Sequence, residues 1–178
     1  DRIALAEKLR WIESSWMCLT IPLLALWGWR ATASYTAGIV GGFLYAVSIS
    51  SVQRSTGAEL STENTAFPFL AAHFFCRSAA PTVDERKNVS WALWGSALSL
   101  AFAVISWDLM QFYVFIRAGW GLWMVLSGGW TLQQAAAKMW ILEWGALFVV
   151  GLLVPYNRVH GFIFSPGMLA ASLGVAVL

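Results

Sequence analysis

The sequence predicts an all-α fold, a polytopic membrane bundle of five or six transmembrane helices that follows an N-terminal amphipathic surface helix. Apolar residues make up 59% of the 178 residues and charged residues 11%, whereas a soluble domain has roughly 45–50% and about 25%. Residues 34–54 form an apolar run long enough to span a bilayer. The 12 Trp and 11 Phe residues fit the enrichment of aromatic rings at membrane interfaces. We therefore expect one integral membrane domain, residues 1–178.

Residues 1–15 have the pattern of an amphipathic helix. Leu5, Leu9, Ile12 and Trp16 recur at helical spacing, and the charged residues lie on the other faces. A helix of this kind that leads into a membrane span is expected to rest on the membrane surface.

Residues 16–54 are expected to form a helical hairpin. The first span covers residues 16–29, and Pro22 either kinks it or marks its true first turn. Residues 31–33 connect it to the second span, residues 34–54. Small residues occupy every fourth position of that span: Ser34, Gly38, Gly42, Ala46 and Ser50.

Residues at this spacing share one helical face, so another helix can pack closely against it. We predict that this helix-packing stripe serves either ordinary intramembrane packing or docking within a larger assembly. The opposite face carries Tyr35, Ile39, Phe43 and Leu44.

Residues 55–88 are expected to form a polar loop that contains a short apolar segment. Residues 66–77 are apolar and aromatic, but they are too few to span a bilayer, which takes about 20 residues. A re-entrant or interfacial segment fits better. Residues 81–88 are expected to form a charged turn.

Residues 89–178 are expected to supply the remaining membrane helices. Residues 89–117 fit either one long helix or two spans that turn near Asp108 and continue to residue 126. We favour one long helix because no Gly or Pro lies near Asp108. Residues 118–129, rich in Gly and Trp, then form an interfacial or re-entrant segment. Further spans are expected over residues 133–156 and 162–178.

The distribution of the 11 Lys and Arg residues orients the predicted bundle. With five spans, the side that holds the N-terminus carries eight of them and the other side carries Arg30, Arg117 and Lys138. The positive-inside rule then places the N-terminus on the cytosolic or stromal side. A six-span arrangement scores equally well. The net charge of +2 and the lack of a basic run argue against nucleic acid as a partner.

Ionisable residues in predicted spans are candidates for function, because burying a charge in hydrocarbon is costly. Asp108 and Arg117 are nine residues apart and cannot pair directly if they share a helix. We expect Glu143 at a membrane interface. No second carboxylate shares the helix of Glu143, so we predict no acid–base pair and no enzymatic activity.

His73 is a candidate ligand for the magnesium of a chlorophyll, or else an interfacial hydrogen-bonding residue. We expect His160 to lie in a turn. Cys18 and Cys76 follow no metal-binding or redox spacing, so we predict no metal site.

Two short segments resemble the ATP synthase protein I family, in particular its plastid branch. Residues 33–45, ASYTAGIVGGFLY, resemble the second membrane helix of that family, and residues 152–158, LLVPYNR, resemble the apolar span that ends in Tyr-Asn-Arg. With the final predicted span, the resemblance covers about a third of the chain. Residues 62–130 have no place in the family's four-helix plan. The family's span order agrees with six spans rather than five.

The resemblance implies a non-enzymatic accessory or assembly protein of the ATP synthase in a plastid thylakoid. Its expected partners are hydrophobic membrane subunits and the lipid bilayer. One alternative is a structural subunit of a photosynthetic or respiratory supercomplex, with chlorophyll, carotenoid or lipid as candidate ligands. A second alternative is a small membrane enzyme that acts on lipid or isoprenoid through Glu143 and Asp108.

Overall fold

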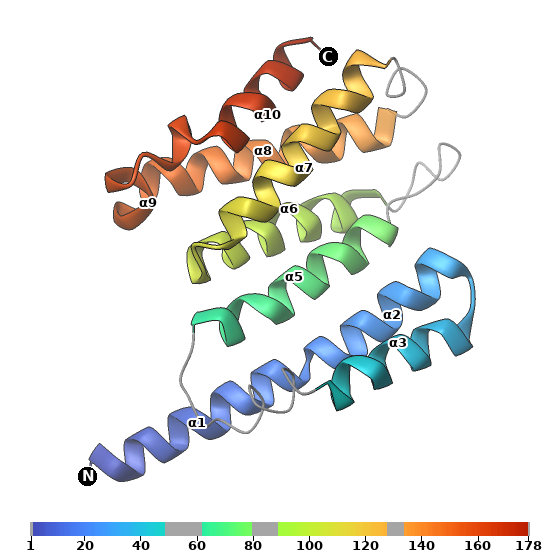
Figure 1. Ribbon diagram of the computed structural model, residues 1–178, viewed down its shortest axis with the longest axis vertical. Helices are drawn as coiled ribbons and strands as arrows, with labels where there is room; N and C mark the ends of the chain where they lie inside the picture. The colour runs from blue at the N-terminus through green and yellow to red at the C-terminus, as the bar shows by residue number, and fades with distance from the viewer. Residues whose placement is uncertain (1, 49–61, 80–88, 128–133, 178) are drawn as a thin grey trace. The chain divides into compact units, whose positions relative to one another are not determined.

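A computed structural model describes residues 2–48, 62–79, 89–127 and 134–177, and every element in these ranges is a helix (Figure 1). The all-α class is therefore confirmed. The chain divides into two units, residues 1–79 and residues 80–178, where the sequence led us to expect one domain. Each unit is described by itself.

The first unit contains α1 (Arg2–Cys18), α2 (Thr20–Thr32), α3 (Tyr35–Val47) and α5 (Thr62–Ala79). The helix that was predicted for residues 1–15 continues to Cys18, and α2 begins two residues later. Pro22 therefore lies in the first turn of α2, one of the two arrangements that the sequence allowed. Proline is tolerated there because the first amides of a helix have no intrahelical acceptor.

A tight turn joins α2 and α3 into the expected antiparallel hairpin (Figure 1). Ala33 has a left-handed backbone with φ 54° and ends α2. Ser34 caps α3, because its Oγ accepts a hydrogen bond of 3.3 Å from the backbone N–H of Ala37. Such a cap satisfies an amide that would otherwise lack a partner at the helix start.

The two helices of the hairpin pack backbone to backbone through glycine. A Cβ atom added at Gly38 would overlap the carbonyl oxygen of Ala25, and one added at Gly42 would lie 3.1 Å from the Cβ of Ala25. Any larger side chain at Gly38 would therefore push α3 away from α2. Val47 ends α3, and residues 49–54 of the predicted 34–54 span, including Ser50, lie outside the described residues.

Helix α5 corrects the prediction for residues 55–88. Residues 62–65 were expected in a polar loop, but they form the first turn of α5. Their polar groups contact α1: the amide of Asn64 donates to Glu13 Oε1 at 3.0 Å, and Trp16 Nε1 donates to the carbonyl of Thr65 at 3.1 Å. These tertiary contacts stabilise a helix start whose composition is typical of a loop.

The second unit contains α6 (Val89–Ser106), α7 (Met110–Leu126) and α8 (Gln134–Leu153). It ends with α9 (Pro155–Val159), the 3₁₀-helix η1 (Phe162–Phe164) and α10 (Pro166–Val177). The favoured long helix over residues 89–117 is wrong, because α6 ends at Ser106 and α7 begins at Met110. The turn near Asp108 that the alternative required is present, and its two membrane spans stay a prediction. At this turn, which contains no Gly or Pro, Asp108 accepts a hydrogen bond from the Tyr156 hydroxyl.

The Gly- and Trp-rich residues 118–126 belong to α7 and are helical, and their expected interfacial or re-entrant position stays a prediction. Gly121 allows close packing, because a Cβ there would lie 2.7 Å from the indole of Trp140 in α8. Trp140 also packs with Ala118 of α7 and Ala171 of α10 in a buried cluster. Small residues on α7 and α10 thus make room for one large ring.

Several helices are shorter than the predicted spans: α2 and α3 have 13 residues each and α10 has 12. In the part of the chain that the structure describes, no helix combines the length and the apolar character needed to cross a membrane. The predicted number of spans stays a prediction.

The hairpin provides a matched pair of glycine variants. We expect Gly38→Ala to lower the free energy of unfolding by about 1–3 kcal/mol, because its Cβ overlaps the α2 backbone. A Cβ at Gly41 meets nothing within 4 Å, so Gly41→Ala should stabilise α3 by about 0.5–1 kcal/mol. Denaturant titration of both full-length variants measures the difference. Equal effects would contradict the glycine contact.

Candidate functional site

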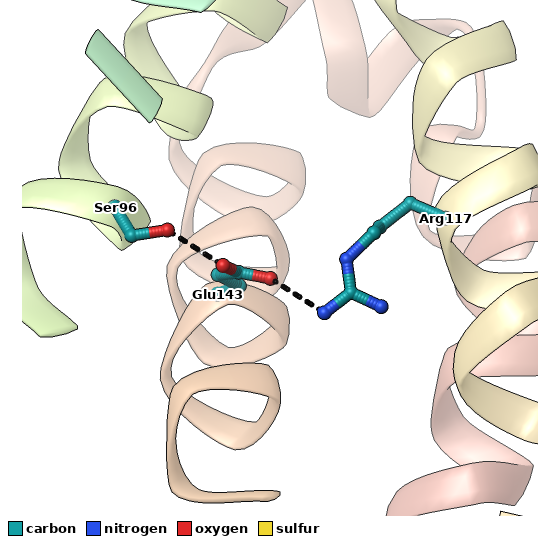
Figure 2. Close-up of polar contacts among 3 residues, drawn as sticks. All are labelled: Ser96, Arg117 and Glu143. Carbon is teal, nitrogen blue, oxygen red and sulfur yellow. Dashed lines mark hydrogen bonds and ion pairs between the residues drawn. The ribbon is translucent and has the colours of Figure 1, made fainter. Parts of the chain in front are cut away.

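Ser96 and Arg117 both contact Glu143, and the three side chains come from three helices of the second unit (Figure 2). Ser96 of α6 donates a hydrogen bond of 2.6 Å to Glu143 Oε1, and Arg117 Nη2 of α7 lies 3.4 Å from Glu143 Oε2. Glu143 itself belongs to α8 and is 2% exposed, while Ser96 is fully buried. The cluster therefore links α6, α7 and α8 through their interior faces.

The charges of this cluster compensate one another. Removing a carboxylate and a guanidinium from water costs several kcal/mol per ion, which is recovered only when the two are paired and hydrogen-bonded. The short bond from Ser96 is of the charge-assisted kind, which is roughly twice as strong as a neutral one. The bond from Arg117 is longer than the about 2.7–2.9 Å of an ideal guanidinium–carboxylate pair. The two charged groups are therefore near each other without being in their closest arrangement.

A small cavity of about 20 Å³ lies beside the ion pair. Arg117 and Glu143 form its polar wall. The remaining wall is apolar or aromatic and comes from α6, α7, α8 and α10: Leu100, Val114, Ala118, Trp140, Trp144, Leu147 and Ala171.

The cluster holds one carboxylate and one cation, which suits a structural polar clamp between helices. General acid–base catalysis normally uses a titratable group that can reach a bound substrate, and this cavity is far smaller than the about 300–1,000 Å³ of a ligand pocket. Among the described residues, no three His, Cys, Asp or Glu side chains gather as a metal site would require. The geometry therefore favours a role in holding the helices together.

Glu143 is buried within the second unit, and its expected position at a membrane interface stays a prediction. Asp108 and Arg117 are not paired with each other; Asp108 binds Tyr156 and Arg117 binds Glu143. The sequence did not indicate the Arg117–Glu143 pair because the two residues lie on different helices, 26 positions apart.

The two histidines occupy different surroundings. His73 lies within α5 and is fully buried, with its ring 5.8 Å from that of Phe74. This burial does not favour a chlorophyll ligand, which needs access to a large macrocycle. His160 follows α9 in the expected turn, where its Nδ1 lies 2.9 Å from the carbonyl oxygen of Tyr156.

The predicted helix-packing stripe of α3 faces into the hairpin. Gly38 and Gly42 are buried against α2, Ala46 is half-buried, and Ser34 caps the helix. Because α2 occupies this face, it is not available to a partner. The exposed face of α3 is the opposite one, where Tyr35, Ile39, Phe43 and Leu44 are 60–69% exposed. We call these four residues the outward face.

No family model, curated protein or solved structure matches this chain. The resemblance to the ATP synthase protein I family stays a prediction from residues 33–45 and 152–158. In the structure, the first segment forms the hairpin turn and most of α3, and the second forms the end of α8 and the start of α9.

The ion pair predicts a strongly non-additive double-mutant cycle. Arg117→Met or Glu143→Met alone leaves a buried charge without its partner and should lower the free energy of unfolding by about 3–5 kcal/mol. The double variant Arg117→Met/Glu143→Met should cost less than either single variant, because no charge remains buried. Denaturant unfolding of the four proteins gives the coupling energy, and additive losses would show that the pair is not formed.

The hydrogen bond from Ser96 has its own test. Ser96→Ala removes a donor from a buried carboxylate and should cost about 1–3 kcal/mol of unfolding free energy. Ser172→Ala is the matched control, because the Ser172 hydroxyl bonds the Met168 carbonyl within α10. Loss of that hydroxyl should leave the free energy of unfolding nearly unchanged. Equal Tm values for the two variants would argue against the Ser96 bond.

Proposed function

We propose that this chain is a non-enzymatic accessory or assembly protein that works in a membrane by docking an apolar helix face onto hydrophobic partner subunits. The observation that carries the proposal is the outward face of α3. Its members Tyr35, Ile39 and Phe43 follow one another at four-residue spacing on a helix whose reverse side is fixed by α2. Contiguous exposed apolar residues of this size are typical of a protein or membrane contact.

The hairpin suits such docking energetically. Burying one large apolar side chain is worth about 1.5–3 kcal/mol, so burial of the outward face can support a stable contact. The glycine packing holds α3 against α2 before any partner arrives, which reduces the ordering cost of binding.

Membrane association is supported by composition and by the second unit. The chain is 59% apolar and 11% charged. Exposed aromatic rings recur near the start of α6 and the end of α7, where Trp91, Trp94, Trp120 and Trp123 are exposed. Trp prefers membrane interfaces because its ring has an apolar body and a polar N–H. We propose an integral membrane position with the N-terminus on the stromal side.

The resemblance supports a specific partner, the ATP synthase of a plastid thylakoid. The matching residues 33–45 include all four outward-face residues, so the whole docking surface falls within the resembling segment. In this proposal, the outward face contacts the hydrophobic subunits of the membrane ring during assembly.

The docking face can be tested with a matched pair of double variants. Ile39→Asn/Phe43→Asn removes an aliphatic and an aromatic side chain from the outward face. Leu5→Asn/Trp11→Asn makes the same change at exposed positions of α1. We expect the first variant to recover membrane-ring subunits at least about tenfold less well in mild-detergent purification, since 1.4 kcal/mol corresponds to tenfold. The control should recover them as the wild type does.

Three results decide between the parts of this proposal. Equal recovery of ring subunits by both variants would contradict docking through α3. Loss in both would indicate general apolar attraction rather than a defined face. Recovery of pigment-binding subunits in place of ring subunits, lost only in the α3 variant, would retain the docking face and replace the ATP synthase as partner.

The membrane position has a separate test. Washing isolated membranes with alkaline carbonate removes peripheral proteins but leaves embedded ones. We expect the chain to stay in the pellet, because its exposed apolar side chains lose favourable burial on release. Quantitative recovery in the supernatant would contradict an integral position while leaving the docking face open to the variant test.

A further inference from the structure

We propose that one buried water molecule binds in the cavity beside Arg117 and Glu143 and bridges the guanidinium to the carboxylate. This inference concerns the interior of the second unit and does not depend on the proposed function.

The cavity has room for a single water molecule. Its volume is about 20 Å³, and one water needs roughly 10–15 Å³ by the same measure. The size of the cavity therefore matches about one water molecule.

The polar wall supplies the hydrogen bonds that an ordered water requires. Buried waters typically make about three hydrogen bonds, with a range of two to four. Arg117 offers N–H donors and Glu143 offers carboxylate acceptors on the same cavity. A water can accept from the first and donate to the second, which matches the sign of both groups.

The geometry of the ion pair allows a water to bond both groups from the side of the cavity, not to lie between the two atoms. Arg117 Nη2 and Glu143 Oε2 are 3.4 Å apart, and an ideal charge-assisted bond is about 2.7–2.9 Å. A bridging water adds two short bonds to charged groups and reduces the cost of burying them. The apolar side chains of Leu100, Val114 and Leu147 restrict the water to the side of the charges.

Filling the cavity tests the proposal, because the effect of a filler depends on what it displaces. Val114 is buried and lines the cavity, so Val114→Ile adds one methylene there. We expect it to lower Tm by about 3–6 °C in the otherwise wild-type chain, where it expels the bridging water. In the Arg117→Met/Glu143→Met background, where no polar wall remains, it should raise Tm or leave it unchanged.

Val149→Ile is the control, since Val149 is exposed on α8 and its change should leave Tm unaltered in both backgrounds. The water is supported only if Val114→Ile lowers Tm in the otherwise wild-type chain and does not lower it in the Arg117→Met/Glu143→Met background. A rise in both backgrounds would mean a dry cavity, and a fall in both would mean simple overpacking; either result overturns the proposal.

A direct measurement keeps the proposal falsifiable if the double-methionine background fails to fold. A crystal structure of the full chain, at a resolution that shows ordered water, should contain a density peak within hydrogen-bond distance of both Arg117 and Glu143. Continuous density for both side chains without such a peak would overturn the assignment.

Discussion

The close contact between α2 and α3 determines which surface of the first unit remains exposed. Gly38 and Gly42 carry no side chain, so the backbone of α3 lies directly against Ala25 of α2. A helix fixed along its small face must present its bulky face elsewhere. Tyr35, Ile39, Phe43 and Leu44 are exposed for this reason, and the proposed docking surface is a geometric consequence of the glycine contact.

The second unit also exposes large apolar side chains, and it buries several polar ones. Its buried side chains include Ser96, Glu143 and Asn157, whereas large apolar side chains are exposed on α6 and α7. Buried polar groups need internal partners, and Glu143 has them in Ser96 and Arg117. A few paired polar groups inside a mainly apolar core, combined with large apolar side chains on the exterior, favour apolar surroundings, either lipid or other membrane subunits. This supports the proposed membrane role from evidence independent of the resemblance.

The sequence predicted the features that depend on local pattern. The helical class, the turn between α2 and α3 and the position of His160 follow from apolar spacing, short polar breaks and turn residues. It failed where tertiary contacts override local signals. Residues 62–65 are polar yet helical, because Asn64 and Thr65 bond to α1. The chain turns at Asp108 without Gly or Pro, where the Tyr156 hydroxyl bonds the carboxylate. The Arg117–Glu143 pair joins separate helices and has no sequence signature.

Site-specific photo-crosslinking tests the central claim, that the outward face of α3 contacts a partner subunit, most directly. A benzoylphenylalanine at position 43 replaces the exposed Phe43 with another aromatic side chain. The same group at position 45 replaces Tyr45, whose hydroxyl lies near Met17 of α1. We predict that position 43 crosslinks to a hydrophobic ring subunit and that position 45 crosslinks only within the chain. Adducts to lipid alone from position 43, or the same partner adduct from both positions, would contradict the claim.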